Sequence, residues 1–559
     1  MASLGRKLKT AFGILRDSGP TGLKRRLAAM KIPRRQKVLY SKWLEKHGSI
    51  SADQLAWMNS TIESFAERPM ISVILPVYNV DEKWLRLCID SVINQIYPHW
   101  ELCIADDASP SPHVGRVLQE YSANDSRIKL ELRSENGHIS AASNSALALA
   151  TGELVALLDH DDELTADALF WVANEFNAYP RTAIIYSDED LIDERGRRFA
   201  PKFKPDFSRD LLYSLNLLTH LSAYRTDLVR SIGGFRIGIE GSQDYDLELR
   251  AIEKIDDDQI RHIARVLYHW RVIRGSVAYS MDEKPYAHER ARDAIRDHFE
   301  RTGIRGKVVE SFLSLHRVTY RNPDRVPPAT VIVSTDVIEG NVCKRIGVAE
   351  NYETVIVPVA VSDRAKLLNE AAARSKADVL VFLDGNLRFV DKEVIDELIA
   401  FAMQPDIGAV AGRIIRSDHC VEQAGIVIQP DLSPAFAHAG FPREAPGNMF
   451  RNRQISNYSA ISVACMVVRR ELFDELGGFN RSVTLTDLFD FDLCLRLWER
   501  NKRIVVLPHV ELIRSGNVPQ RIFRPEDLEA FRSRWHQYED RDPFCNPNLK
   551  RDGSFGIDV

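Results

Sequence analysis

The chain has 559 residues, 45% of them hydrophobic and 27% charged, with a net charge of -5. That length is too great for one ordinary core, so we expect at least two domains, and the weak negative charge argues against a general nucleic-acid binder. Seven scattered cysteines include no CxxC pair, which excludes a zinc ribbon and a disulfide framework and fits a cytoplasmic protein.

Residues 1–68 are predicted to form a basic, helical N-terminal segment. Eleven Lys or Arg and one acidic residue, Asp17, lie within residues 1–38, and apolar residues follow a helical spacing from Leu4 to Leu15. A basic amphipathic helix can lie on an anionic membrane surface, so we expect peripheral contact with the inner face of the cell membrane. A solvated arm packed on the next domain is the alternative. Because no apolar run reaches about 18 residues and the start lacks a continuous apolar core, we expect neither a membrane-spanning helix nor a signal peptide.

From Pro69 the sequence alternates between strands and helices. Strands are predicted at 71–78, 101–105, 128–132 and 154–158, and helices at 82–96 and 141–150. Such alternation predicts an α/β fold with a mostly parallel sheet covered on both faces. Ligands of these sheets bind at the carboxyl ends of the strands. We therefore place the first domain at 69–322 and its site at that edge.

A second α/β region, at 329–525, repeats the order of the first after a Pro-rich linker. Gly233-Gly234-Phe235 is matched by Gly477-Gly478-Phe479, and Asp244-Tyr245-Asp246 by Asp490-Phe491-Asp492. A duplicated domain is the simplest explanation of these repeats. Residues 526–559 are expected to form a C-terminal tail.

Acidic residues follow the strand that ends at Leu158. In an extended chain, residues two apart point the same way, so Asp159 and Asp161 can face one cavity. Like charges held so close repel unless a cation joins them, and oxygen ligands suit Mg²⁺ or Mn²⁺. Asp162 completes this candidate metal site. A solvated acidic turn that caps the next helix is the alternative interpretation.

Three further positions carry candidate chemistry. Asp107, after another strand of the same sheet, could accept the N–H of a uracil or thymine ring, although an Asx turn would also explain it. Asp244 opens an amphipathic helix and could act as a general base, or could simply cap the helix. His269 could join the metal, and Arg271 could contact phosphate, although a lone histidine in an apolar strand is more often a core residue.

Together these motifs resemble the family 2 glycosyltransferases of the GT-A fold, and most closely the bacterial polysaccharide and O-antigen transferases. Pro76-Val77-Tyr78-Asn79 is similar to the family's nucleotide loop, Asp106-Asp107 to its base-binding pair, and Asp159-His160-Asp161-Asp162 to its DxD motif. The resemblance implies a GT-A fold and assigns two sets of residues. The donor-binding set is Pro76, Tyr78, Asn79, Asp107, His138, Asn144, Asp161 and Arg271. The metal set is Asp159, Asp161, Asp162 and His269.

The same resemblance implies an inverting transferase with Asp244 as the catalytic base and Mn²⁺ or Mg²⁺ as the cofactor. The donor would be a UDP-, dTDP- or GDP-linked sugar, and the acceptor a glycan or a lipid-linked glycan of a cell-surface polysaccharide. A nucleotidyltransferase is the main rival among enzymes, but it would need a basic, Gly-rich loop that Pro76–Asn79 does not supply. A non-catalytic glycan-binding or scaffold protein is the rival of another class.

The second domain also resembles the family, but its motifs are altered. Asp384-Gly385-Asn386 occupies the DxD position, Pro358-Val359-Ala360 replaces the acidic pair, and Ile513-Arg514-Ser515 replaces the histidine. We therefore expect a degenerate, non-catalytic GT-A-like domain; a bifunctional protein with two active domains is the alternative.

Overall fold

Two mixed α/β units make up the computed structural model, which describes residues 36–273, 285–320, 326–336, 342–358, 364–391, 394–481, 488–516 and 525–559. Leu44–Val318 form the first unit; Thr319–Val559, with the described residues up to Trp43, form the second. The boundaries of the first domain predicted from the sequence are instead near residue 68 and in the linker at 323–328. Residues 1–35, which contain the predicted amphipathic helix, lie outside the described residues.

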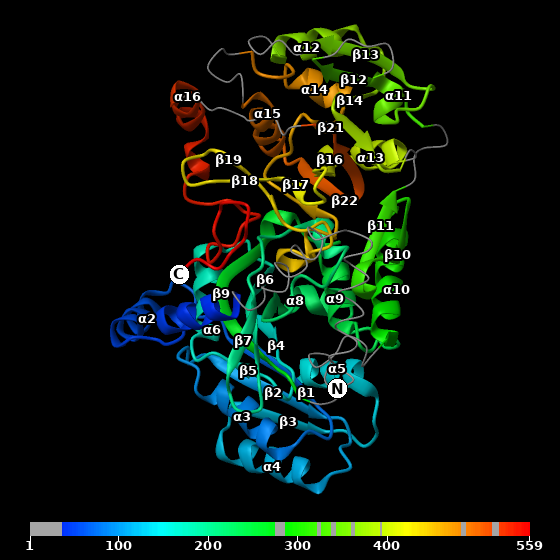
Figure 1. Ribbon diagram of the computed structural model, residues 1–559. Helices are drawn as coiled ribbons and strands as arrows, with labels where there is room; N and C mark the ends of the chain where they lie inside the picture. The colour runs from blue at the N-terminus through cyan, green and yellow to red at the C-terminus, as the bar shows by residue number, and fades with distance from the viewer. Residues whose placement is uncertain are drawn as a thin grey trace, which may run out of the picture. The chain divides into compact units, whose positions relative to one another are not determined.

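The first unit contains a nine-stranded sheet in which β3, β2, β1, β4, β8, β6, β9 and β5 are neighbours in that order, and β7 pairs with β6 (Figure 1). β1, β2, β3 and β4 are parallel where they pair, whereas β8 is antiparallel to β4 and β6. The strands are β1 (Ile71–Val77), β2 (Trp100–Asp106), β3 (Ile128–Leu132), β4 (Leu154–Leu157), β5 (Glu163–Leu164), β6 (Ile184–Ile192), β7 (Arg198–Lys202), β8 (Ser222–Arg225) and β9 (Ile260–Arg271).

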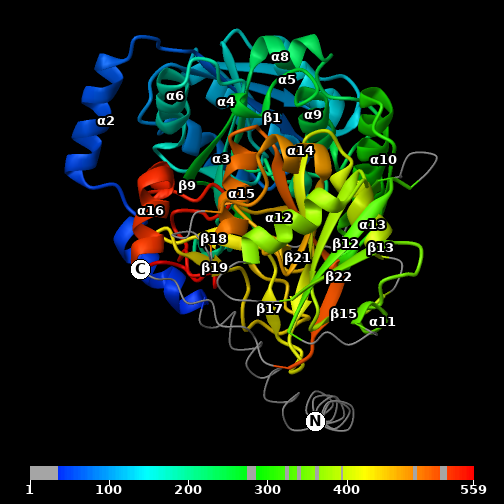
Figure 2. The same ribbon diagram turned by 90° about the horizontal axis from the view of Figure 1, so that it is seen from above.

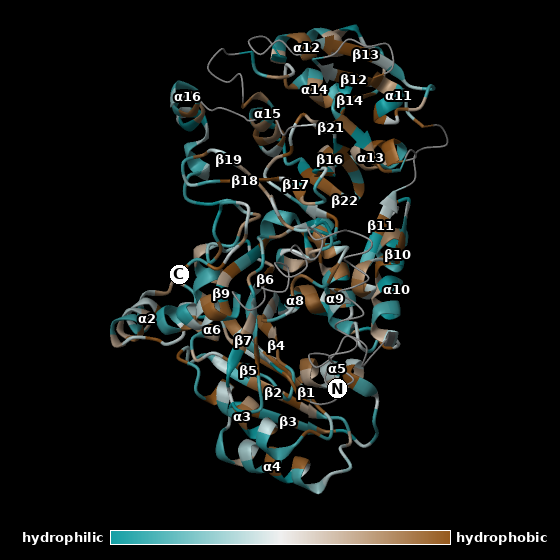
Figure 3. Cartoon of the chain, viewed as in Figure 1, coloured by the Kyte–Doolittle hydropathy of each residue, from teal (hydrophilic) through white to brown (hydrophobic). Residues whose placement is uncertain are grey.

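Amphipathic helices cover this sheet because their apolar faces match its buried strands. In α3 the residues Leu85, Cys88, Ile89 and Val92 are buried at helical spacing. α10 lies beside α9 in both views (Figures 1 and 2), and its charged sequence is largely teal in Figure 3, whereas β4 is brown. The helices are α2 (Ala52–Ser64), α3 (Glu82–Ile93), α4 (Pro112–Asn124), α5 (His138–Leu149), α6 (Ala168–Ala178), α7 (Arg209–Leu212), α8 (Thr226–Ser231), α9 (Gln243–Ala251) and α10 (Pro285–Thr302).

The second unit repeats this topology. Its main sheet has the order β13, β12, β14, β21, β16, β22, β15, which matches β2, β1, β4, β8, β6, β9, β5 strand for strand, and each pair of neighbours has the same relative direction in both sheets. The strands are β12 (Ala329–Thr335), β13 (Glu353–Pro358), β14 (Val379–Asp384), β15 (Leu387–Phe389), β16 (Ile407–Ile415), β21 (Cys465–Arg469) and β22 (Arg503–Arg514).

The second unit also contains helices and short additional strands. The helices are α11 (Val342–Ile346), α12 (Arg364–Arg374), α13 (Val394–Ala402), α14 (Arg470–Glu475), α15 (Phe489–Trp498) and α16 (Pro525–Trp535), and the short strands are β17 (Val421–Gln423), β18 (Ile426–Ile428), β19 (Pro434–Phe436) and β20 (Ser456–Asn457). The two sheets confirm the predicted α/β fold class with a duplicated domain.

The C-terminal segment, expected as a tail, packs into the second unit. Asp542 accepts from the amide nitrogen of Ile428 at 2.5 Å, and the indole of Trp535 donates to Asp492 at 3.2 Å. Trp43 belongs to the same unit, and its Nε1 donates to Asn548 at 3.1 Å. No helix in the described ranges is long and apolar enough to cross a membrane, and the seven cysteines, all of which are described, are free.

Candidate active site

The predicted site residues follow neighbouring strands at one edge of the first sheet. Val77 pairs with Asp106 at the ends of β1 and β2, and the amide of Asp107 donates to the carbonyl of Val77 at 2.8 Å. On the other side of β1, the amide of Leu158 donates to the carbonyl of Ile74 at 3.2 Å. The acidic residues after β2 and β4 therefore lie on either side of the Pro76–Asn79 loop, as parallel strands require.

The Asp107 carboxylate is buried and accepts hydrogen bonds from two neighbouring groups. It is 2% exposed, and its Oδ1 accepts from Arg133 Nε and from the amide of Gly137, both at 2.9 Å. The amide of Asn79, whose φ is 48°, donates to Ser109 Oγ at 2.8 Å. Tyr78 is 47% exposed, and His138, at the start of α5, is also exposed. This side of the site presents both buried polar and open aromatic groups.

Asp162 differs from its neighbours because its carboxylate points inward. Its two oxygens accept from the Tyr268 hydroxyl at 2.6 Å and from the amide of Arg271 at 2.7 Å, and the residue is 1% exposed. The Asp159 side chain, in contrast, is 46% exposed. Asp161 is partly buried, and burial together with the charge of Asp159 raises the pKa of its carboxyl. Asp159 and Asp161 are thus more accessible than Asp162, and the predicted metal role of all three stays a prediction.

Arg271 fastens the acidic turn to the sheet. Its Nε donates to the carbonyl of Asp161 at 2.7 Å, its guanidinium pairs with Glu163, and it lies 4.4 Å from the ring centroid of Trp84. The side chain is 1% exposed, and these contacts are structural. The predicted phosphate contact of Arg271 stays a prediction.

His269 lies opposite the acidic turn, because β5 pairs Glu163 with His269. Its Nδ1 is 2.6 Å from Asp190 Oδ1, and the other carboxylate oxygen of Asp190, Oδ2, pairs with Arg198 at 2.7 Å. Across the described ranges, no three His, Cys, Asp or Glu side chains are arranged to hold a metal ion. The four predicted ligands therefore do not form a closed all-protein metal cage.

Asp244 lies in the first turn of α9, and its Oδ2 accepts from Asn216 Nδ2 at 3.0 Å. Burial raises the pKa of its carboxyl, the charge of Asp159 adds to this rise, and His220 opposes it. Asp244, His220 and Asp159 are therefore close enough to interact electrostatically. A carboxylate with a raised pKa is a better base than a free aspartate.

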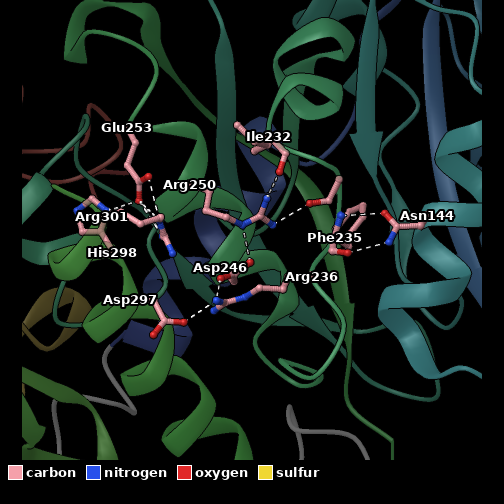
Figure 4. A network of polar contacts seen from close by, with 11 residues as sticks. Asn144, Ile232, Phe235, Arg236, Asp246, Arg250, Glu253, Asp297, His298 and Arg301 are labelled. Carbon is pink, nitrogen blue, oxygen red and sulfur yellow. Dashed lines mark hydrogen bonds and ion pairs between the residues drawn. The ribbon is translucent and has the colours of Figure 1, made fainter.

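The start of α9 is held by buried ion pairs (Figure 4). Asp246 lies between Arg250 and Arg236, each 2.7 Å away, and Arg250 also donates to the carbonyls of Ile232 and Gly234. Asn144 holds the same turn, because its amide donates to the carbonyl of Phe235 at 2.7 Å and accepts from the Phe235 amide at 2.8 Å. In the structure Asn144 is therefore a clamp, and its predicted contact with the donor stays a prediction.

The sequence analysis missed His220 and Glu189. His220 Nδ1 is 2.8 Å from Glu189 Oε2, and its Nε2 is 3.9 Å from Asp159 Oδ2. Burial alone would raise the pKa of Glu189, but Lys202, Lys204 and His220 hold it well below its usual value. Three consecutive acids, Asp188 to Asp190, inside an apolar strand were the signal in the sequence, because buried acids require partners.

In the second unit the corresponding edge is neutralised from within. Arg514 is 2% exposed and pairs with Asp384 at 2.9 Å and with Glu422 at 2.6 Å. Asp490 accepts from the amide of Val463 at 2.9 Å. One buried arginine therefore neutralises both of these carboxylates.

The fold and this edge define an α/β protein with a strand-end acidic site. Residues 72–232 match the model of the family described as Glycosyl transferase family 2. For this segment, the match confirms the resemblance that the sequence motifs indicate.

Two relatives match most of the chain. An uncharacterized protein, y4gI, of Sinorhizobium fredii is 36% identical over 536 residues, which cover 88% of this chain and 59% of that protein. The O-antigen biosynthesis protein RfbC of Myxococcus xanthus is 30% identical over 544 residues, which cover 87% of this chain and 41% of RfbC. The chain thus spans about half the length of these relatives.

Similarity to solved structures is weaker. S. aureus TarS 1-349 in complex with UDP-GlcNAc is 20% identical over 41% of this chain and 72% of that one, with a TM-score of 0.32. The mannosyltransferase PcManGT of Pyrobaculum calidifontis, in complex with GDP-Man and Mn2+, is 19% identical over 42% and 65%, with a TM-score of 0.30.

Proposed function

We propose that the chain transfers a sugar from a nucleotide-diphosphate donor to a glycan or lipid-linked glycan during the synthesis of a cell-surface polysaccharide. One observation carries the proposal: Asp107, Asp159 and Asp161 flank the same strand-end loop, and Asp244 interacts electrostatically with Asp159. The family assignment of residues 72–232 and the relative named for O-antigen biosynthesis support it.

The donor's nucleotide belongs on the Asp107 side of the site. Oδ1 of Asp107 is held by Arg133 and Gly137, so the carboxylate is fixed in place and can accept a base N–H through its other oxygen. Pro76, Tyr78, Asn79 and His138 would line the same pocket. UDP-, dTDP- and GDP-linked sugars are all donors to test.

A divalent cation, Mn²⁺ or Mg²⁺, fits Asp159 and Asp161. Mg²⁺ is commonly bound by one or two carboxylates plus substrate phosphates, so a site that protein groups alone do not close is compatible with it. Burial, with the charge of Asp159, raises the pKa of the Asp161 carboxyl although His160 and Arg271 oppose the rise, and a bound cation would favour its ionised form. The bound ion would stabilise the charge on the leaving diphosphate. Asp162 would position the turn, and His269 lies opposite the turn on β9.

Asp244 is the proposed base for inverting transfer. Its carboxylate, held by Asn216, would take the proton of the acceptor hydroxyl as that oxygen attacks the anomeric carbon. The nucleoside diphosphate leaves from the opposite face, so the anomeric configuration inverts. Burial makes this carboxylate a stronger base than one in water.

The second unit is proposed to be non-catalytic and to bind the acceptor glycan or support assembly. Arg514 supplies an internal cation at the edge where the first unit keeps open carboxylates. Contact of residues 1–38 with a membrane, and location at its inner face, remain predictions because residues 1–35 are outside the described ranges.

The test is a panel of UDP-, dTDP- and GDP-sugars, with Mn²⁺, with Mg²⁺ or with a chelator, assayed for donor hydrolysis and for transfer to extracted polysaccharide intermediates. We expect metal-dependent turnover of one donor class that Asp244→Asn removes and Asp490→Asn leaves. Turnover lost on Asp490→Asn alone would show a second active domain. Donor binding without turnover of any donor would favour a glycan-binding or scaffold protein.

A further inference from the structure

The duplication supplies an internal comparison for every residue of the first sheet. The strand registers align Arg225 with Arg469, because Leu154 pairs with the former and Val379 with the latter. The same registers align Ile184 with Ala409 and Ile260 with Ile504. Counting along the strands then assigns each site residue a counterpart in the second unit.

Residues that hold the shared fold are kept in both units. Asn144 clamps the backbone of Phe235, and Asn369 clamps Phe479 in the same way, at 2.8 and 2.9 Å. Asp246 pairs with Arg250 four residues later, and Asp492 pairs with Arg496 at the same 2.7 Å. A polar residue required by the fold is therefore expected to recur.

One chain of contacts in the first unit does not recur. Glu189, His220 and Tyr268 align with Ile414, Ala464 and Leu512, respectively. Ile414 and Leu512, which lie on strands, are buried and apolar, and Ala464 is buried as well. The fold is thus built without these three polar side chains in the second unit, whose acidic edge is neutralised by Arg514.

The three side chains form a continuous path to the acidic turn. Glu189 Oε2 accepts from the His220 amide at 2.6 Å and lies 2.8 Å from Nδ1 of the same residue. The His220 ring stacks on Tyr268 with a centroid distance of 4.6 Å. The Tyr268 hydroxyl donates to Asp162 at 2.6 Å and accepts from the Asp159 amide at 3.2 Å.

Lys204 holds the backbone of Thr219 and His220. Its Nζ donates to the carbonyl of His220 at 2.9 Å and also contacts the carbonyl of Thr219. The imidazole is thus held by its backbone, its Nδ1 and its ring face, and Nε2 faces Asp159. Groups held in this way set the position of the residues they touch.

We infer that Glu189, His220 and Tyr268 are positioning residues that fix the Asp159–Asp162 turn for donor binding. This inference rests on the proposed function, since the turn is the part of the site that faces the donor's diphosphate. The three residues act through Asp159 and Asp162.

The test compares Tyr268→Phe, His220→Ala and His220→Asn with His298→Gln in the full chain. Phe keeps the ring stack but removes the hydroxyl, and Asn can still donate to Glu189. His298 is a matched control because its Nδ1 is also 2.8 Å from a glutamate, Glu253, in the same unit (Figure 4). The readouts are kcat and donor KM, the melting temperature, and hydrogen exchange of the peptide that contains residues 158–164.

We expect Tyr268→Phe and His220→Ala to lower kcat/KM for the donor by about 10–100-fold. The value for His220→Asn should lie between those of the wild type and His220→Ala. Both should speed hydrogen exchange in 158–164, whereas His298→Gln should change neither. Wild-type exchange in that peptide, or wild-type kinetics, in folded Tyr268→Phe and His220→Ala would overturn the inference. If the wild-type chain transfers no sugar but the exchange changes as expected, the proposed function fails and the positioning of the turn stands.

Discussion

Replacing Asp244 by Asn tests the proposed base directly. Asn has nearly the same shape and can still accept from Asn216 Nδ2, so the local packing is kept. Only the ionisable oxygen is lost. A general base contributes about 10²–10⁴-fold to a rate, which equals about 2.7–5.5 kcal/mol of barrier. We expect kcat to fall within that range with little change in donor KM.

The same substitution should leave the fold intact or make it more stable. Burial raises the pKa of Asp244 above its unfolded value, so at neutral pH its ionised form opposes folding, and Asn removes that opposition. Transfer kinetics and thermal unfolding at pH 7 measure the two effects. Asp490→Asn in the second unit is the control and should keep wild-type kcat. If Asp244→Asn keeps more than about a tenth of wild-type kcat, the base assignment is wrong.

Three other changes have defined outcomes. Asp161→Asn should lower metal-supported kcat by about 10²–10³-fold, and an equal response to added Mn²⁺ in variant and wild type would contradict the metal assignment. Asn144→Ala leaves two backbone groups of Phe235 without partners and should cost about 1–3 kcal/mol in chemical denaturation; an unchanged midpoint would refute the clamp. Asn216→Ala removes a donor to the ionised form of Asp244, so its pKa rises further and the acidic limb of kcat/KM moves to higher pH. A shift to lower pH would contradict this reasoning.

The fold could be predicted largely because its signals are local. Apolar runs bounded by turns define strands such as β3 (Ile128–Leu132), whose bounds match the predicted strand at 128–132. The repeated Gly-Gly-Phe and Asp-x-Asp motifs predicted the duplication. They repeat because Asn144 and Asn369 clamp the first motif, and Arg250 and Arg496 bind the second.

The site was predicted less completely because its contacts are made across the fold. Periodicity places Asp159 and Asp161 beyond a strand, but it does not reveal that Asp162 turns inward to Tyr268, more than a hundred residues away. His220 lies in a loop with no motif of its own. Its role depends on Glu189, which reads in sequence as one of three acids in a strand. Only tertiary structure pairs these residues.

The identical strand order of the two sheets has a consequence for folding. A chain that carries two copies of one topology can exchange equivalent strands while it folds. β6 would bring Asp188, Glu189 and Asp190 into the place of Arg413, Ile414 and Ile415. Glu511, which pairs with Arg413, would then face a carboxylate, and the apolar neighbours of Ile414 and Ile415 would offer the other two acids no partner. These buried charges therefore disfavour an exchange of β6 and β16 during folding.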